Sequence, residues 1–455
     1  MGDNVEGTVT GKYDQAVVEG ELRAATVGLR DALLGALSGH IWLSPQEARV
    51  SNGLLAASNG GTAKFELAAP LDPKAQTGTL NATLERIDLE AILAAVGAPD
   101  VNDFVSGVVS GNAQLSGLPG ALKGQAQIAL LEGRIADQPA ELAQAQLKFD
   151  SETARLEQLE VKLPQSRITA EGSLRMADYS FQLHSKADQV GLESLAQALA
   201  KDGELKNTRI EGTADADLVV TGKILTGKKP DLDWESLQLT FLAQGQHVKV
   251  NGRDTGELRL AAKTSPGGRL DISLVTGILA TLNPADKGRT EALTGSIELR
   301  QPGRPITLSS KLDDLKVAPL LEIFAPGLSN TLAGSLDGTL QLSGPTVDPN
   351  GNSAFDKLRG TLTLTDLALT LAETPVQITA PVTITFANQQ ITLPDTPVVW
   401  QGVDVHIGGV VGLTDAAAMN FALNGTVNFD RMSPLSTDTL LFGKATIDAK
   451  LQGSA

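Results

Sequence analysis

The chain has 455 residues, enough for about three average domains by length alone. It contains no cysteine, which excludes disulfides, iron–sulfur clusters and thiolate zinc sites, and its four histidines leave little for metal or acid–base chemistry. A net charge of −16 argues against attraction to nucleic acid or to an anionic membrane as the main activity, because both need a positive surface. Hydrophobic residues make up 42% but aromatic residues only 4%, so the apolar content is aliphatic.

The two ends show no targeting segment. The opening Met1-Gly2-Asp3-Asn4 has neither the basic nor the apolar region of a signal peptide. The longest apolar runs, 91–96 and 274–282, are shorter than the ~18–20 residues that span a bilayer. Because strand-like alternation begins at once and continues to the last residues, we expect both ends to be cut from a longer chain.

Alternation of apolar and polar residues with period two predicts strands along most of the chain. Clear examples are 258–260, 297–299, 360–364, 376–386 and 403–407. Turn residues such as Asn59-Gly60-Gly61 and Pro349-Asn350-Gly351 separate the runs. These patterns predict an all-β chain: an elongated, curled antiparallel sheet of about 30 strands, from the roughly 8–12-residue turn spacing.

Short helices interrupt the strands in a regular order. Apolar residues at helical spacing predict helices over 89–96, 192–199, 317–324 and, less fully, 432–435. Each follows an alternating strand and precedes a hairpin that begins at a glycine: Gly107, Gly212, Gly334 and Gly443. The chain is therefore expected to be a repeat array.

The repeat predicts the domain organisation. We expect a partial unit over 1–97, whole units over 98–200, 201–325 and 326–440, and the start of a truncated unit over 441–455. Tandem independent β-sandwiches are the alternative, but no Pro/Ser-rich linker separates the units.

One face of the sheet is expected to be aliphatic, and a few short helices cannot cover it. Either this face is an open groove for an apolar ligand, or the sheet curls on itself around a dry core; periodicity leaves both open. The residues expected to line it are Leu258, Leu260, Ile297, Leu299, Leu362, Leu364, Val376, Ile378, Val382, Ile384, Phe386, Val403, Val405 and Ile407.

The run Leu340-Gln341-Leu342-Ser343-Gly344, followed by Asp348-Pro349 and embedded in the strand, short helix and hairpin pattern, resembles the AsmA-like superfamily of bacterial envelope proteins. Within it, the translocation and assembly module proteins are most similar. Residues 332–435 carry the resemblance best, and the repeat extends it over most of the chain. The motifs are degenerate, because they consist of aliphatic alternation and glycine.

The resemblance implies a periplasmic, open, U-shaped β-structure whose aliphatic groove carries phospholipid between the inner and outer membranes and supports outer-membrane assembly. It also implies an inner-membrane anchor helix and, as a partner, an outer-membrane barrel of the TamA type. This sequence shows neither the anchor helix nor a recognisable domain for the barrel, so we expect a middle piece of the longer protein. The alternative is a structural or adhesive β-solenoid with a dry core.

Catalytic and metal motifs are incomplete, so neither an enzyme nor a cofactor is expected. The run 222–229 almost matches a P-loop, but Lys229 stands where Ser or Thr would contact Mg²⁺. The run that begins at Asp348 lacks the glycine and the glutamate of a calcium loop. The pairs Asp313/Asp314 and Asp231/Asp233 are typical of solvated turns, and His184 and His406 are expected on the polar faces of strands. Trp42, Trp234 and Trp400 receive no role.

Overall fold

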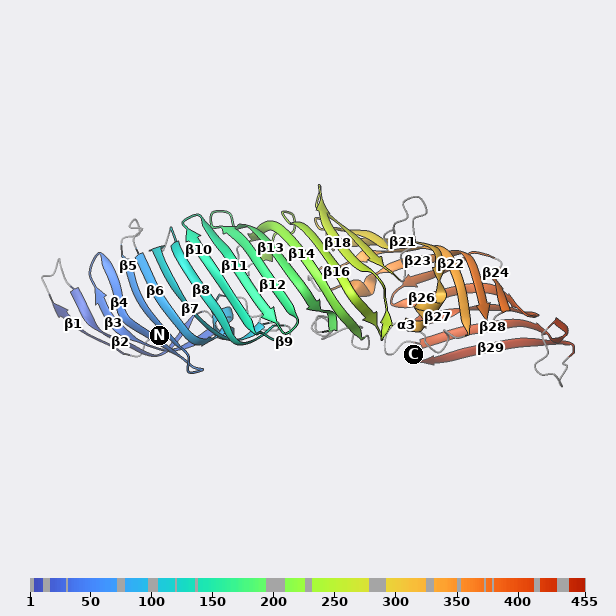
Figure 1. Ribbon diagram of the computed structural model, residues 1–455, viewed down its shortest axis with the longest axis horizontal. Coiled ribbons are helices and arrows are strands. Elements are labelled where there is room, and N and C mark those ends of the chain that lie inside the picture. The colour runs from blue at the N-terminus through green and yellow to red at the C-terminus, as the bar shows by residue number, and fades with distance from the viewer. Residues whose placement is uncertain are drawn as a thin grey trace. The chain divides into compact units, whose positions relative to one another are not determined.

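The computed structural model describes residues 4–10, 17–29, 32–71, 78–96, 105–118, 121–135, 138–193, 209–225, 231–277, 292–324, 331–349, 353–371, 374–378, 380–412, 418–431 and 442–454. These residues form strands β1 to β29, helices α1 (Leu89–Val96) and α3 (Val317–Phe324), and two 3-10 turns, η5 (Phe355–Lys357) and η6 (Phe429–Arg431) (Figure 1). The expected all-β fold, a curled antiparallel sheet with a few short helices, is confirmed.

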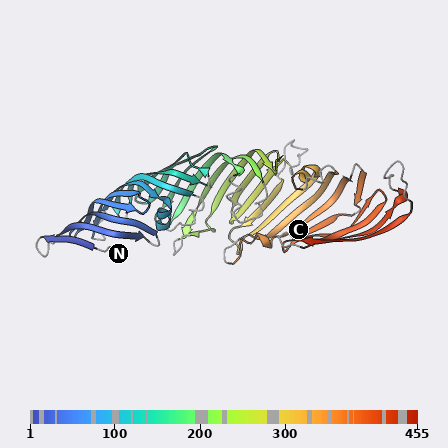
Figure 2. The same cartoon turned by 90° about the horizontal axis from the view of Figure 1, so that it is seen from below.

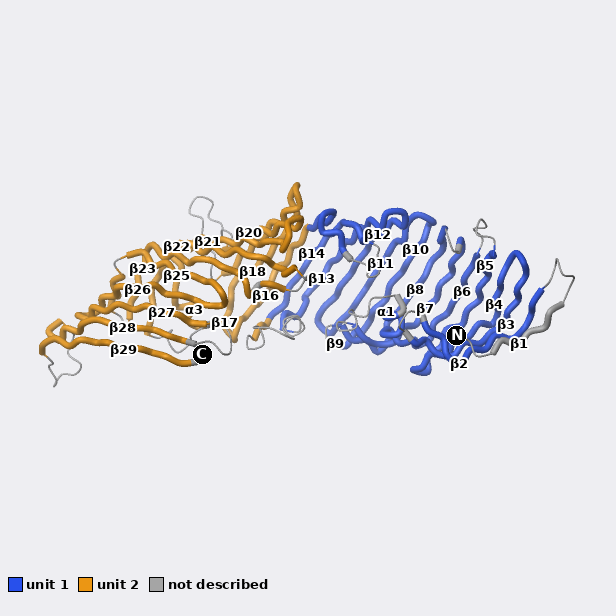
Figure 3. The backbone as a smooth tube through the Cα atoms, turned by 180° about the vertical axis from the view of Figure 1, so that it is seen from behind, with its two compact units in different colours: residues 1–208, 212–239 blue, residues 209–211, 240–455 orange. Residues whose placement is uncertain are grey.

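The chain divides into two compact units (Figure 3). Unit 1 comprises residues 1–208 and 212–239, and unit 2 comprises residues 209–211 and 240–455. The structure does not test the boundaries predicted from the repeat, which stay a prediction.

Unit 1 is a ladder of antiparallel strands in chain order, in which β10 pairs with β8 and the short β9 pairs with the last residues of β8. Its strands are β1 (Asn4–Thr10), β2 (Val17–Leu29), β3 (Ala32–Leu43), β4 (Glu47–Ala57), β5 (Thr62–Pro70), β6 (Gly78–Asp88), β7 (Val105–Leu118), β8 (Lys123–Ile135), β9 (Gln138–Pro139), β10 (Leu142–Asp150), β11 (Thr153–Leu163), β12 (Ser166–Arg175), β13 (Ser180–Gly191), most of β14 (Ile210–Leu225) and β15 (Asp231–Leu232).

Unit 2 is built in the same way, with β18 paired to β16 and β25 paired to β23. Its strands, coloured from yellow to red, lie side by side in Figure 2. Its strands are most of β16 (Gln238–Val250), β17 (Arg253–Asp254), β18 (Leu258–Ser265), β19 (Arg269–Thr276), β20 (Leu293–Glu298), β21 (Pro305–Lys316), β22 (Leu332–Pro345), β23 (Arg359–Leu371), β24 (Thr374–Ile378), β25 (Val382–Ala387), β26 (Gln390–Trp400), β27 (Val403–Gly412), β28 (Ala418–Asn428) and β29 (Lys444–Ser454).

The helices lie where the apolar spacing predicts them. The expected helices over 89–96 and 317–324 are confirmed as α1 and α3. The side chain of Asp88 caps α1 by accepting the N–H of Glu90 at 3.0 Å. Leu192 and Glu193 are helical, but residues 194–199 and 432–435, on which the other two expectations fall, lie outside the described residues.

A recurring β-bulge leads into each helix. Arg86, Gln189 and Asp314 have φ values of 56°, 52° and 49°, and helical residues begin three positions later, at Leu89, Leu192 and Val317. The register of the strand shifts at each of these sites, between Leu84 and Ile87, Ala187 and Val190, and Leu312 and Leu315. A bulge re-aims the chain, and here it ends the strand so that the helix can begin.

A side chain of the strand that follows each helix accepts a hydrogen bond from the backbone of the bulge. The N–H groups of Arg86, Gln189 and Asp314 donate to Ser110 Oγ (3.0 Å), Asp215 Oδ1 (2.8 Å) and Asp337 Oδ1 (2.5 Å). Each acceptor lies three residues after a glycine with positive φ: Gly107, Gly212 and Gly334. The same junction thus occurs three times in the described chain, as expected for a repeat.

Candidate functional site

The sheet of unit 2 has one face built from aliphatic side chains, called here the aliphatic face. Strand pairing places its members side by side: Ile272 lies opposite Gly295, Gly295 opposite Leu308, and Leu308 opposite Leu342. Thr294, Ser296, Thr307 and Ser309 alternate with them and form the opposite, polar face. Period-two alternation in strands that pair in register is what produces two faces of unlike chemistry.

The predicted lining residues on strands share this face, and all of the predicted residues belong to unit 2. Their cross-strand pairs are Leu258–Thr276, Leu260–Leu274, Ile297–Ile306, Leu362–Ile384, Leu364–Val382, Phe386–Gly360, Val376–Leu369, Ile378–Val398, Val403–Val427, Val405–Gly425 and Ile407–Leu423.

Leu299 differs from its neighbours. Strand β20 ends at Glu298, and Leu299 lies in the following turn, where its N–H donates to the carbonyl of Gly268 at 3.0 Å. The side chain is nevertheless buried. The alternation 297–299 therefore predicted an inward side chain correctly but a strand where the chain already turns.

Helix α3 divides the aliphatic face into two zones. In the covered zone, Leu312, Leu315, Leu364 and Val382 form a buried cluster against which Leu320 of α3 packs. Leu364 is 8% exposed and Val382 is 4% exposed. This part of the face is a packed apolar cluster.

The open zone lies on β18 to β20. Leu258, Leu270, Ile272, Leu274 and Ile297 are only half-buried, although they stand in the interior of a sheet. Leu260 is 37% exposed. Leu362 and Ile384, which pack against the covered cluster, are half-buried too. The exposure of Leu260 is therefore what marks this zone as the more open one in the described chain.

Several lining residues were missed by the sequence reasoning. Leu274, Leu308, Leu340, Ile391 and Leu423 lie on the same face, opposite predicted members or their neighbours. The same alternation would have found them. In unit 1 a second cluster, for which no lining was predicted, contains Ala143, Val161 and Leu163 with Leu130, Ile135, Ala140, Leu159 and Ile168 packed against it.

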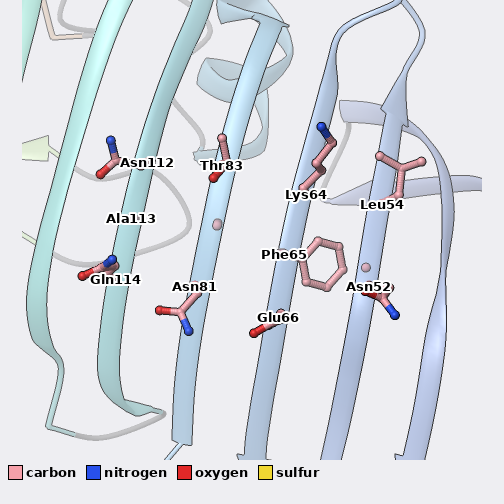
Figure 4. Close-up of a pocket in the computed structure, with 12 residues that line it drawn as sticks. Asn52, Leu54, Lys64, Phe65, Glu66, Asn81, Thr83, Asn112, Ala113 and Gln114 are labelled. Carbon is pink, nitrogen blue, oxygen red and sulfur yellow. The ribbon is translucent and has the colours of Figure 1, made fainter.

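Two hollows lie over polar faces rather than over the aliphatic face. One, of about 530 Å³ in unit 1, is lined by Asn81, Asn112, Gln114, Lys64 and Glu66 among others (Figure 4). The other, of about 630 Å³ in unit 2, is lined mainly by Ser and Thr side chains between Arg269 and Thr361. Such polar linings do not suit an acyl chain, so neither hollow supports a lipid site.

The histidines of the polar faces pair with carboxylates. His184 Nε2 lies 3.1 Å from Asp217 Oδ1, and His406 Nδ1 lies 2.9 Å from Asp395 Oδ2. Both imidazoles are partly exposed, which confirms their expected place on the polar faces of strands. In the described residues, no group of three or more His, Asp or Glu side chains could hold a metal ion.

The incomplete motifs give no site in the part of the chain that the structure describes. Residues 226–230 of the P-loop-like run and 350–352 of the calcium-loop-like run lie outside the described residues. Asp314 pairs with Lys316 at 2.7 Å, and Lys316 and Ser335 hold the pKa of Asp314 below its usual value. Arg49 lies over the ring of Trp42 at 5.2 Å from its centroid, which explains the place of this tryptophan by a cation–π contact.

The comparisons with known proteins give no neighbour. No family model, no curated protein and no solved structure matches the chain. Among the described residues, no helix combines the length and the apolar character needed to cross a membrane.

Proposed function

We propose that the aliphatic face of unit 2 binds the acyl chains of phospholipids, with the open zone as the place of contact. The observation that carries the proposal is the half-buried state of Leu258, Ile272 and Leu274 together with the exposure of Leu260. Covering such a surface with an acyl chain gains about 25 cal/mol per Å² of apolar area. An acyl chain is therefore an energetically suitable occupant.

The chemistry of the open zone suits transport better than tight recognition. Its lining consists mainly of Leu, Ile and Ala side chains, which form no hydrogen bonds. Its threonines, Thr264 and Thr276, lie at the two ends of these rows, and the Thr276 hydroxyl donates to the carbonyl of Thr255 at 3.4 Å. An acyl chain that gains the same free energy at each position can slide along the sheet. This supports a conduit in which the protein carries lipid along its aliphatic face.

The resemblance to the AsmA-like superfamily supports the wider setting of this proposal. On that basis the chain belongs to a periplasmic conduit of the cell envelope that moves phospholipid between the inner and outer membranes. The longer protein would hold the inner-membrane anchor and contact an outer-membrane barrel of the TamA type. The three bulge, helix and glycine junctions add the regular repeat that such a conduit needs.

Lipid carried through purification tests the proposal. The protein is purified without detergent, and bound phospholipid is measured by organic extraction and native mass spectrometry. We expect phospholipid in the wild type, a loss in Leu260→Arg, and no loss in Leu242→Arg. Leu242 is the matched control, because it is 39% exposed and lies opposite Ala261, on the polar face of the adjacent strand.

The structural β-solenoid with a dry core is the competing function. The covered zone favours it locally, because Leu364 and Val382 are buried. It predicts that no lipid co-purifies and that Leu260→Arg and Leu242→Arg behave alike. Either result would contradict the lipid proposal.

A further inference from the structure

The polar hollow of unit 1 is a trough that crosses strands β4, β5, β6 and β7. Each strand contributes three consecutive residues to its lining, and strand pairing places the middle residues Gly53, Phe65, Ala82 and Ala113 side by side. Because side chains alternate between the two faces of a sheet, the backbone of these four residues forms the floor of the trough and the residues beside them form its walls. Strands lie ~4.7–4.9 Å apart, so the trough is roughly 14 Å long between its outer strands.

The walls of the trough are two rows of mostly polar side chains (Figure 4). One row consists of Leu54, Lys64, Thr83 and Asn112, and the other of Asn52, Glu66, Asn81 and Gln114. Asn52 joins its row at a β-bulge, where its φ is 49° and the register shifts between Val50 and Gly53. Half of the wall side chains are thus amides.

Three of these amides, Asn81, Asn112 and Gln114, are exposed to solvent. Asn81 lies directly opposite Gln114, where side chains are close enough to interact across the strands. Nevertheless, none of the three amide side chains has a hydrogen-bond partner within the described part of the chain. Their donors and acceptors are therefore available to a ligand.

The hollow of unit 2 differs in this respect. The hydroxyl oxygens of Thr294 and Ser309 lie 3.2 Å apart, and those of Ser296 and Thr307 lie 3.1 Å apart. The hydroxyl groups of that hollow thus bind one another across the strands. Of the two hollows, the trough of unit 1 is the one whose polar side chains remain available.

The rows of amides continue beyond the trough onto β8 and β10. Gln125 lies opposite Gln114, and Gln127 lies opposite Asn112. Gln146 lies opposite Gln127 in turn, and all three of these added glutamines are exposed. A ligand that uses this surface is therefore elongated and runs across the strands.

The charge of the trough favours a neutral ligand. Its charged lining residues are Lys64 and Glu66, one of each sign, and Lys64 pairs with Glu85 at 3.4 Å. This lining lacks the positive surface that a nucleic acid needs. A peptide strand adds to the edge of a sheet, whereas β4 and β7 at the ends of the trough are themselves paired with β3 and β8.

We infer that the trough of unit 1 binds a neutral glycan chain that lies across the strands. Each amide offers N–H donors and a carbonyl acceptor, and each sugar hydroxyl both donates and accepts. Successive sugars of an extended glycan therefore meet amides of successive strands. The inference concerns the polar face of unit 1, so it goes beyond the lipid proposal for unit 2 and does not depend on it.

Three hexasaccharides test the inference by isothermal titration calorimetry on the full chain. Chitohexaose and cellohexaose are neutral, with and without N-acetyl groups, and hexagalacturonic acid carries a carboxylate on each sugar. The variant is Asn81→Ala/Asn112→Ala/Gln114→Ala. Its control is Gln182→Ala/Gln238→Ala/Gln244→Ala, which removes the same number of exposed amides from strands outside the trough.

The wild type should bind a neutral hexasaccharide more tightly than hexagalacturonic acid. The trough variant should lose about tenfold in the association constant, because each neutral hydrogen bond contributes modestly, and the control should bind as the wild type does. Binding of chitohexaose alone or of cellohexaose alone would support the inference and identify the class of sugar. Binding of neither, tighter binding of hexagalacturonic acid, or equal losses in variant and control would overturn it.

Glycan length provides a second measurement that needs no variant. Because the trough crosses four strands, a disaccharide reaches only part of its amides. The wild type should therefore bind the disaccharide of the same series at least about tenfold more weakly than the hexasaccharide. Equal affinity for the two lengths would contradict an extended glycan site.

Discussion

Phenylalanine and glycine face each other across strands throughout the sheet. Most strand phenylalanines lie directly opposite a glycine of the neighbouring strand: Phe65–Gly53, Phe149–Gly124, Phe181–Gly222, Phe386–Gly360 and Phe421–Gly409. A large ring fills the space that the missing side chain leaves, and close approach of neighbouring backbone requires the glycine. At these five positions the ring keeps the strands packed beside a glycine.

Gly409 tests this pairing. A Cβ atom there would lie 2.8 Å from Phe421 Cδ1 and 2.4 Å from the carbonyl oxygen of Asn420. Gly409→Ala should therefore lower the free energy of unfolding by about 1–3 kcal/mol, measured by urea denaturation. Gly453→Ala is the control, because nothing lies within 4 Å of its Cβ position and its φ is not positive. Equal changes in the free energy of unfolding for the two variants would show that the Phe–Gly pairing does not contribute to stability.

His40 carries a pH-dependent contribution to stability. Its Nε2 lies 2.9 Å from Glu19 Oε1 and its Nδ1 lies 3.5 Å from Glu21 Oε1. The hydrogen bond that the His40 ring donates to the Glu19 carboxylate, and then the one to Glu21, raise the pKa of His40 above its ordinary value of 6.5. The protonated imidazole is thus favoured in the folded chain.

The sign of the pH effect follows from this direction. The stabilisation by the protonated His40 ring is fully present below pH 6.5, the pKa of the imidazole in the unfolded chain. It is lost as the pH rises through the raised pKa of His40 in the folded chain. An NMR titration of the His40 ring should show the raised pKa in the wild type and a lower one in Glu19→Gln. A pKa that is the same in both proteins would contradict the assignment.

At the scale of single elements, the bulge that precedes each helix depends on one acceptor from the next strand. Asp337→Ala would leave the N–H of Asp314 without this acceptor, which should cost about 0.5–1.5 kcal/mol in the free energy of unfolding. Asp337→Asn keeps a side-chain oxygen and should restore most of the loss. Asp366, directly opposite Asp337, provides the control variant Asp366→Ala. If Asp366→Ala costs as much as Asp337→Ala, the hydrogen bond is not the cause.

The covered and open zones should respond differently to a buried charge. Leu364→Arg would place an unpaired guanidinium among Leu312, Leu315 and Val382, which should cost about 3–5 kcal/mol and lower the urea midpoint sharply. Leu260→Arg, at a side chain that is 37% exposed, should cost less than about 1 kcal/mol. Equal losses would mean that the open zone is a packed core as well.

At the scale of the whole molecule, the local pattern of apolar and polar residues predicted two helices and the face of the sheet on which each strand residue lies. Helices 89–96 and 317–324 were identified because period-two alternation stops there and apolar spacing changes to that of a helix. The lining residues share a face because alternation alone assigns the face of each strand residue. Both properties depend only on neighbours along the chain.

Which part of the aliphatic face is covered by other residues could not be predicted from alternation. Leu260 and Leu364 stand in the same kind of alternation, yet one is exposed and the other buried. The difference depends on where α3 packs, which is set by the bulge at Asp314 and by contacts between residues far apart in the sequence.

Photo-crosslinking at residue 260 tests the central claim, that the open zone holds acyl chains, most directly. A photoreactive amino acid replaces Leu260 in one protein and Leu242 in another, and both are irradiated in the cells that produce them. The account predicts a phospholipid adduct at residue 260 and none at residue 242, although their exposures are 37% and 39%. No adduct at residue 260, or equal adducts at both, would contradict it.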